Sequence, residues 1–144
     1  MREETQSLKS KASKPPLDCP FCEPAADRIL IERKHFRILL DGYPISPGHA
    51  LIVPIRHVAR WDETSQPEQR ALVEAIDVAQ AEIRKQHRPD GFNIGINDGA
   101  AAGQTIPHLH IHVIPRYEGD LADPRGGVRW VIPDRADYWS DRER

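Results

Sequence analysis

The sequence predicts an α+β domain in which one long helix accompanies an antiparallel sheet of about five strands. Short runs of β-branched and apolar residues occur both before and after a single long segment with helical periodicity. Strands, then one helix, then strands again is an order that favours an antiparallel sheet over a parallel one. The chain of 144 residues is most simply one domain and is long enough to bury a core.

The strands expected before the helix are Ile29–Ile31, Phe36–Leu40 and Ala50–Ile55. Turn residues separate the second of these runs from the third, first as Asp41-Gly42 and then as Ser46-Pro47-Gly48. The first half of the chain is therefore predicted to be a series of short strands joined by tight turns.

The one long helix is expected from Ser65 to His87. Ser65 and Glu68 have the spacing of a capping box, and Pro67 suits the first helical turn. The apolar residues that follow recur at helical spacing and predict one buried face. They are Leu72, Ala75, Ile76, Ala79 and Ile83.

The strands expected after the helix are Phe92–Ile96 and a run that starts at His108, with a Gly/Ala-rich loop, Asp98–Gly103, between them. After Tyr117 the chain is rich in Gly and Pro, and Val128–Ile132 is one more short strand candidate.

Composition limits the function classes. The formal net charge of −2 gives no electrostatic reason to expect nucleic-acid or membrane binding. No apolar run approaches the ~20 residues of a membrane span, and residues 1–18 contain no apolar signal-peptide core. We therefore expect a cytoplasmic protein with a flexible tail over residues 1–17, one domain over 18–139 and a solvated end over 140–144.

Residues 108–112 read His-Leu-His-Ile-His. On a strand, successive side chains point to opposite faces, so His108, His110 and His112 would share one face at steps of ~6.5–7 Å. Leu109, Ile111 and Val113 would enter the core from the other face. Three stepped imidazoles are hard to explain as packing, because histidine serves as nucleophile, proton carrier or metal ligand near neutral pH.

The loop before these histidines fits phosphate chemistry. Its small residues permit close backbone approach, and its N–H groups are suited to cradle a phosphate. A histidine can attack a phosphate ester or anhydride and hold the transferred group covalently, provided that a partner sets its tautomer and donors surround the phosphate oxygens.

Gly103 to Arg116, GQTIPHLHIHVIPR, resembles the signature of the histidine triad (HIT) family, His-φ-His-φ-His-φ-φ with φ apolar. All seven signature positions match. The resemblance continues through Asp41, Ser46–Pro54 and Asn97-Asp98-Gly99, and covers roughly residues 18–118. It implies a HIT-like fold, with a short second helix or turn besides the long helix.

The resemblance also implies roles for single residues. His110 would be the nucleophile that attacks the α-phosphate of a nucleoside 5′-phosphate derivative, and His112 would assist it. Asp41 would hold the ribose hydroxyls. The phosphate would be contacted by Asn97 and by the loop end, Gly103, Gln104 and Thr105.

Plainer roles are open for some of these residues. Asp41 precedes a glycine and is also a typical turn residue, and Asn97 is equally suited to cap the Asn-Asp-Gly turn. His112 would also fit as a half-buried histidine with satisfied hydrogen bonds.

The two cysteines form a Cys19-x-x-Cys22 pair, which is half of a tetrahedral metal site. In metal-binding relatives such a pair joins two histidine positions, so the resemblance implies that His57 and His108 complete the set. Four protein ligands leave no open position, so this Zn²⁺ would be structural. A reduced, metal-free thiol pair is the alternative.

The resemblance leaves several functional hypotheses. The first is a nucleotidyl hydrolase or transferase that acts on dinucleoside polyphosphates or on nucleoside phosphoramidates. The second is a nucleotide-binding module with little turnover that acts through a partner. A metal bound by all three triad histidines is disfavoured, because positions i, i+2 and i+4 of one strand are nearly collinear.

The resemblance further implies a homodimer. The C-terminal segment from 119 to 139 is predicted either to reach a second phosphate or a base through Arg125, Arg129 and Trp130, or to pack on its own domain.

Overall fold

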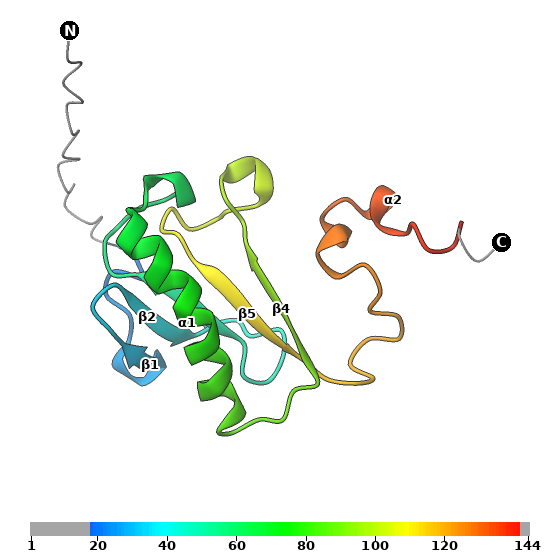
Figure 1. Cartoon of the computed structure of the whole chain (residues 1–144), viewed down its shortest axis with the longest axis horizontal. Helices are drawn as coiled ribbons and strands as arrows, with labels where there is room; N and C mark the ends of the chain where they lie inside the picture. The colour runs from blue at the N-terminus through cyan, green and yellow to red at the C-terminus, as the bar shows by residue number, and fades with distance from the viewer. Residues whose placement is uncertain (1–17, 142–144) are drawn as a thin grey trace, which may run out of the picture.

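The computed structural model describes residues 18–141, and the expectations for 1–17 and 142–144 lie outside it. Five strands form one antiparallel sheet in the order β1-β2-β3-β5-β4 (Figure 1). Their bounds are Ile29–Glu32 for β1, Phe36–Leu40 for β2, Ala50–Pro54 for β3, Gly91–Ile96 for β4 and Ile111–Arg116 for β5. The predicted α+β class and sheet are confirmed.

The long helix α1 spans Gln66–Arg84 and begins with the predicted capping box. The Ser65 hydroxyl accepts from the Glu68 backbone N–H at 3.2 Å, and the Glu68 carboxylate accepts from the Ser65 N–H at 2.9 Å. The helix ends three residues before the predicted His87, because Pro89 disfavours helical backbone in the residue before it and the chain has to turn into β4.

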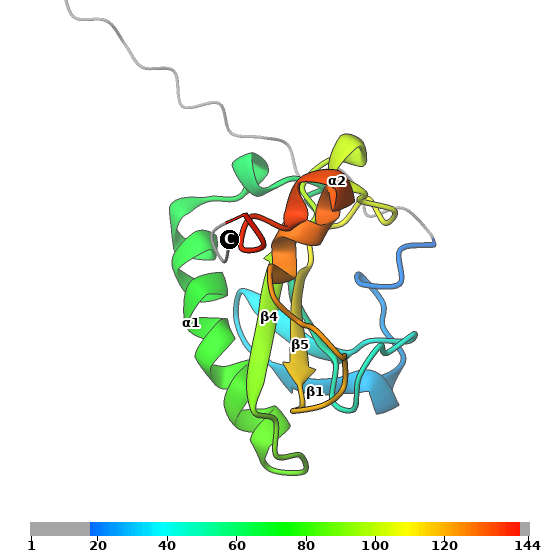
Figure 2. The ribbon, with the colours of Figure 1, turned by 90° about the vertical axis from the view of Figure 1, so that its right-hand side faces the viewer.

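The sheet carries apolar residues on both faces. Helix α1 covers one face and buries its apolar side there (Figure 2), with Leu72, Ala75, Ala79 and Ile83 against Ile38, Ile52, Leu109, Ile111 and Val113. The other face is covered by the segment before β1, where Cys19 and Phe21 pack on Leu39, Leu51 and Val53. The N-terminal segment is therefore part of the folded domain from residue 18 onward.

Four short 3₁₀ helices and a short α2 complete the described chain. They are η1 (Ala26–Arg28), η2 (Trp61–Glu63), η3 (Ala100–Ala102), η4 (Gly127–Val131) and α2 (Pro133–Ala136). None of the described helices has the length and apolar character needed to cross a membrane.

The expectation that the last strand starts at His108 was wrong, because β5 starts at Ile111. The neighbouring strand β4 ends at Ile96, opposite Ile111, and the pairing of β5 with β3 also starts at Ile111, opposite Ile52. Leu109 instead donates its N–H to the Val58 carbonyl at 2.7 Å. The alternation of faces still holds, since Leu109, Ile111 and Val113 are all buried in the core.

The expectation of a strand over Val128–Ile132 was also wrong. This stretch forms most of η4 and leads into α2. Gly126 and Gly127 have φ of 93° and 47°, which turns the chain there, and Pro133 begins α2. The apolar side chains are mostly exposed rather than paired in a sheet, with Val131 at 74% and Val128 at 62%.

Candidate functional site

The three triad histidines lie together on the face of the sheet that the N-terminal segment covers. His108 and His110 are buried and His112 is half-buried. The His110 and His112 rings are 5.1 Å apart, and Phe21 packs 5.0 Å from the His110 ring and 5.8 Å from the His108 ring. One aromatic side chain therefore contacts both of the first two histidines.

The backbone sets the tautomer of His110. Its Nδ1 lies 2.9 Å from the His108 carbonyl oxygen. Because a carbonyl only accepts, Nδ1 carries the proton, and in the neutral ring Nε2 then keeps its lone pair. His110 lines a cavity of about 240 Å³ together with His112, Phe21, Asp41 and Thr105. The ring nitrogen with nucleophilic character is thus the one that the backbone bond leaves available.

His112 is oriented by His49, which the sequence did not identify as a site residue. His49 Nδ1 accepts from the Ile45 N–H at 3.2 Å, so its Nε2 carries the proton in the neutral ring. That Nε2 lies 2.9 Å from His112 Nδ1 and donates to it. His112 is therefore left with an Nε2–H, a donor for an oxygen of a bound ligand.

Burial keeps this pair uncharged. Desolvation is the main cause that lowers the pKa of His112 to about 4, assisted by the neighbouring His110 and His49. Burial also lowers the pKa of His49, against the nearby Asp41, which raises it. Near neutral pH both rings are neutral, which is the state that the chain of hydrogen bonds requires.

Asp41 has the turn contact considered for it and also lines the cavity beside His110. Its Oδ1 accepts from the Tyr43 N–H at 2.7 Å, which is a turn contact. Its Oδ2 lies 3.3 Å from His49 Nε2, and the residue also lines the cavity beside His110. The carboxylate is thus placed at the cavity wall by the turn after β2.

The loop between β4 and β5 is held by Gln104. Its side-chain oxygen accepts from the Gly99 N–H at 2.9 Å, and its amide donates to the Ala59 and Ile106 carbonyls at 2.7 and 3.0 Å. Both amide protons are used inside the protein. Gly99 and Gly103 have φ of 99° and 93°, which favours glycine at both positions.

Other predicted loop residues reach the cavity. Asn97, Gly103 and Thr105 line the same 240 Å³ cavity as His110. The loop backbone and these side chains thus form one wall of the space beside the nucleophilic nitrogen.

The four predicted metal ligands come together on the far side of His108. Cys19 Sγ lies 3.3 Å and Cys22 Sγ 3.5 Å from His108 Nδ1, while His57 Nδ1 lies 3.2 Å from Cys22 Sγ and 3.1 Å from His108 Nδ1. His108 Nε2 donates to the Pro54 carbonyl at 2.8 Å, so in the neutral ring its Nδ1 has a lone pair that faces the sulfurs.

This donor set fits a metal ion. Tetrahedral Zn²⁺ with Zn–N of ~2.0–2.1 Å and Zn–S of ~2.3 Å separates its ligand atoms by about 3.3–3.8 Å, close to the spacing found here. Burial lowers the pKa of His108 to about 4, so this ring is neutral, as a ligand must be. Burial, followed by the neighbouring Cys19, raises the pKa of Cys22 to about 12. A bound cation would hold the sulfurs as thiolates.

A second group of potential ligands, Asp41, His49 and His112, also lies within 4.8 Å. Here the 2.9 Å contact between the two rings is a hydrogen bond with a proton on His49 Nε2, the atom that would have to bind the metal. The cysteine cluster is the better metal site among residues 18–141.

The C-terminal arginines are engaged within their own segment. Arg125 pairs with Asp123 at 3.0 Å and lies over the Trp139 ring. Arg129 donates to the Ala136 carbonyl at 2.9 Å and lies over the Tyr138 ring. Trp130, the third residue expected to reach a ligand, lines a cavity.

Comparison with known proteins agrees with this site. A family model described as the HIT domain matches residues 23–119. The bis(5′-adenosyl)-triphosphatase of Saccharomyces cerevisiae is 35% identical over an alignment of 118 residues, which covers 78% of this chain and 52% of that enzyme. The chain thus spans about half the length of this relative.

Two solved structures are similar in fold and sequence. A Zn-bound histidine triad family protein from Mycobacterium smegmatis has 30% identity and a TM-score of 0.64, over 88% of this chain and 98% of that one. A hypothetical histidine triad nucleotide-binding protein from Sulfolobus tokodaii has 33% identity and a TM-score of 0.66, over 73% of both chains. The HIT domain model covers most of the chain and includes all three triad histidines, so this chain belongs to the HIT family.

Proposed function

We propose that this protein is a nucleotide hydrolase that forms a covalent nucleotidyl intermediate on His110. The observation that carries the proposal is the His110 ring itself, whose Nδ1 proton is held by a backbone carbonyl while Nε2 keeps its lone pair beside a ligand-sized cavity. The similarity to a bis(5′-adenosyl)-triphosphatase favours dinucleoside polyphosphates as substrates, with nucleoside phosphoramidates as the competing class.

The proposed reaction has two displacements. His110 Nε2 forms a bond to the α-phosphorus, and the bond from that phosphorus to the leaving oxygen or nitrogen breaks. Water then attacks the same phosphorus, the P–N bond to His110 breaks, and a nucleoside monophosphate is released. The Nε2–H of His112 and the backbone N–H of Thr105 would donate to the phosphate oxygens as charge develops on them.

We further propose that Cys19, Cys22, His57 and His108 hold a structural Zn²⁺. The ion would tie the N-terminal segment to the sheet and would take no part in the displacement. This is supported by the donor set and by the Zn-bound relative. A homodimer remains a prediction from the family resemblance.

The test compares the wild type with His110→Ala on diadenosine triphosphate, diadenosine tetraphosphate and adenosine 5′-phosphoramidate. His35→Ala, on the turn between β1 and β2, is the matched histidine control. We expect turnover to be lost only in His110→Ala, and intact mass to show a nucleotidyl adduct on the wild type. Full activity of His110→Ala would exclude the covalent mechanism. A wild type that binds nucleotides without turnover or adduct would favour the binding-module alternative.

A further inference from the structure

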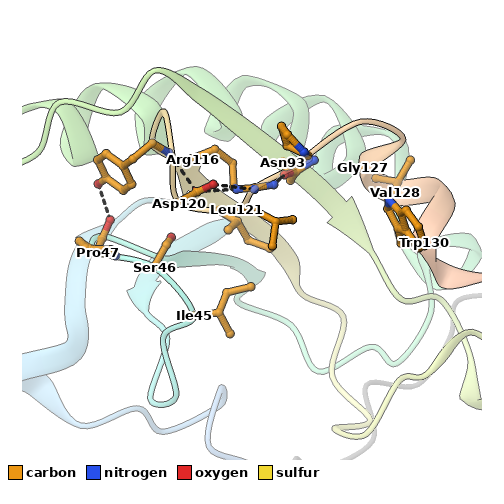
Figure 3. A pocket seen from close by; sticks show the side chains of 13 residues that line it. Ile45, Ser46, Pro47, Asn93, Arg116, Asp120, Leu121, Gly127, Val128 and Trp130 are labelled. Carbon is orange, nitrogen blue, oxygen red and sulfur yellow. Dashed lines mark hydrogen bonds and ion pairs between the residues drawn. The ribbon is translucent and has the colours of Figure 1, made fainter. Parts of the chain in front are cut away.

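A separate pocket of about 560 Å³ lies between the C-terminal arm, residues 117–141, and the end of the sheet (Figure 3). We call it the arm pocket. Ile45, Ser46 and Pro47 form one side, and Leu121, Val128 and Trp130 lie across from them. Between the two sides lie residues of β4 and β5, namely Asn93, Ile114 and Arg116.

The arm pocket adjoins a hollow that is lined by the third triad histidine. A hollow of about 410 Å³, lined by Asp41, His49 and His112, shares Ile45, Asn93, Ile114 and Val128 with it. On β5, residues 112, 114 and 116 share one face, and their side chains are all half-buried. At ~3.3 Å per residue, the arm pocket therefore extends from about 7 to about 13 Å beyond His112 along the strand.

The lining of the arm pocket suits an uncharged ring better than a phosphate. The guanidinium of Arg116 is already paired with Asp120 at 2.8 Å and donates to Asn93 Oδ1 at 2.7 Å. The facing walls are mostly apolar, and the Trp130 ring is held by its Nε1–H, which donates to the Arg125 carbonyl at 2.8 Å. A fixed indole beside aliphatic side chains is a surface on which a nucleobase stacks.

Ser46 adds a polar group to this apolar space. Its hydroxyl oxygen is buried and is the only buried side-chain nitrogen or oxygen among residues 18–141 without a hydrogen-bond partner. Burying a hydroxyl unpaired costs free energy, which a ligand with donors or acceptors at its edge would recover. A nucleobase combines such an edge with an apolar face.

We propose that the arm pocket receives the nucleoside of the leaving group, so that the substrates are dinucleoside polyphosphates. This rests on the proposed displacement at His110. The 240 Å³ cavity contains both His110 and His112, whereas the hollow that leads to the arm pocket contains His112 but not His110. In an in-line displacement the leaving group departs on the side away from the nucleophile. The arm pocket is lined by Ile114 and Arg116 and so lies beyond His112, on the side of the triad away from His110.

The test uses two substrates that share the adenylyl group and differ in the leaving group. Diadenosine triphosphate loses ADP, which carries a second nucleoside, whereas adenosine 5′-phosphoramidate loses only ammonia. The measured quantity is the ratio of kcat/KM for the first substrate to kcat/KM for the second. We expect Trp130→Ala to lower this ratio about tenfold, the typical effect of removing one aromatic face from under a base.

Two further variants keep the test falsifiable. Leu121→Ala removes another side chain of the arm pocket without removing a side-chain hydrogen bond, and should lower the ratio in the same direction. Val131→Ala, on the same arm but outside the pocket and 74% exposed, should leave it unchanged. Light scattering of each variant reports whether the arm instead joins two copies of the chain.

The outcomes separate the two proposals. A wild type that hydrolyses neither substrate refutes the proposed function and the leaving-group pocket with it. The pocket assignment alone is refuted if the wild type hydrolyses diadenosine triphosphate and both Trp130→Ala and Leu121→Ala have the wild-type ratio of kcat/KM values. The pocket assignment is also refuted if light scattering shows that these variants no longer form an oligomer while their kcat/KM ratio is unchanged. A wild type active only on the phosphoramidate also overturns the assignment.

Discussion

Removing the metal that we propose at the cysteine cluster should lower stability without unfolding the domain. The cluster ties the segment around Cys19 and Cys22 to His57 and His108, but both faces of the sheet are also held by apolar packing. Metal that binds only the folded state at about 1,000 times its Kd stabilises that state by about 4 kcal/mol. For a chain of this length, unfolding entropy near the midpoint is about 0.3 kcal/mol/K, so Tm should fall by about 14 °C.

The assay is thermal unfolding of the full chain with and without a chelator, together with the zinc content per chain by mass spectrometry. We expect one zinc per chain in the wild type and a lower Tm after chelation. Cys22→Ser should start with the lower Tm and respond little to the chelator. His49→Asn, which alters only the second ligand group, should keep its metal.

Two results would refute this reasoning. One is a wild type that takes up no zinc and has the same Tm with and without chelator. The other is a metal that Cys22→Ser retains and His49→Asn loses, which would move the site to the second group.

Three other predictions concern single side chains. Glu68→Ala should lower the free energy of unfolding in urea at pH 7 by about 2 kcal/mol, because it removes the hydrogen bonds that the buried Glu68 carboxylate accepts from Arg56 and from the Ser65 N–H. Burial alone would raise the pKa of Glu68, but hydrogen bonds from Arg56 and from the helix cap outweigh it and lower the pKa below its usual 4.5. The stabilisation by ionised Glu68 is therefore complete above pH 4.5, and it is lost as the pH falls through the lower pKa that Glu68 has in the folded state. If the loss of unfolding free energy in Glu68→Ala stayed constant down to pH 2, this explanation would be contradicted. His49→Phe should lower kcat about 10- to 100-fold with little change in KM, because it removes the hydrogen bond that orients His112. His49→Gln should recover part of this kcat. Wild-type kinetics in His49→Phe would show that His49 has no role in the site. Gly48→Ala should destabilise the fold by about 1–2 kcal/mol in the same unfolding assay. The backbone φ at Gly48 is +87°, and the new Cβ would lie 2.8 Å from the His87 ring. Gly91→Ala is the control, because open space surrounds Gly91 and no loss of stability is expected.

Local sequence patterns predicted those features that depend on neighbouring residues. The capping box needs only that Ser65 and Glu68 lie three positions apart, and it is present. The strands were predicted from their composition, and their antiparallel order from the single helix between them. The buried alternation of Leu109, Ile111 and Val113 also followed from a two-residue period.

The errors came from contacts distant in sequence. Whether residues 108–110 continue a strand depends on where the pairing of β5 with β3 and β4 ends, which no local pattern near His108 records. Val128–Ile132 has strand-like composition, but Val128–Val131 lie in the 3₁₀ helix η4 and do not pair with the edge strand β4.

The role of His49 was missed for a similar reason. It becomes visible only when the pairing of Leu51 with His112 brings the start of β3 beside β5. The arm pocket likewise depends on how the chain returns after Tyr117, which composition alone does not give.

Phe21 lies between the two cysteines in the sequence and packs against the His110 ring in the structure. The same short segment therefore supplies both of the proposed sulfur ligands and a wall of the cavity beside His110, the proposed nucleophile. His108 extends this link, since its ring faces the sulfurs and its carbonyl holds His110. Specific activity should then report how completely a preparation is loaded with metal, and batches purified with and without chelator would differ in active fraction rather than in affinity for substrate.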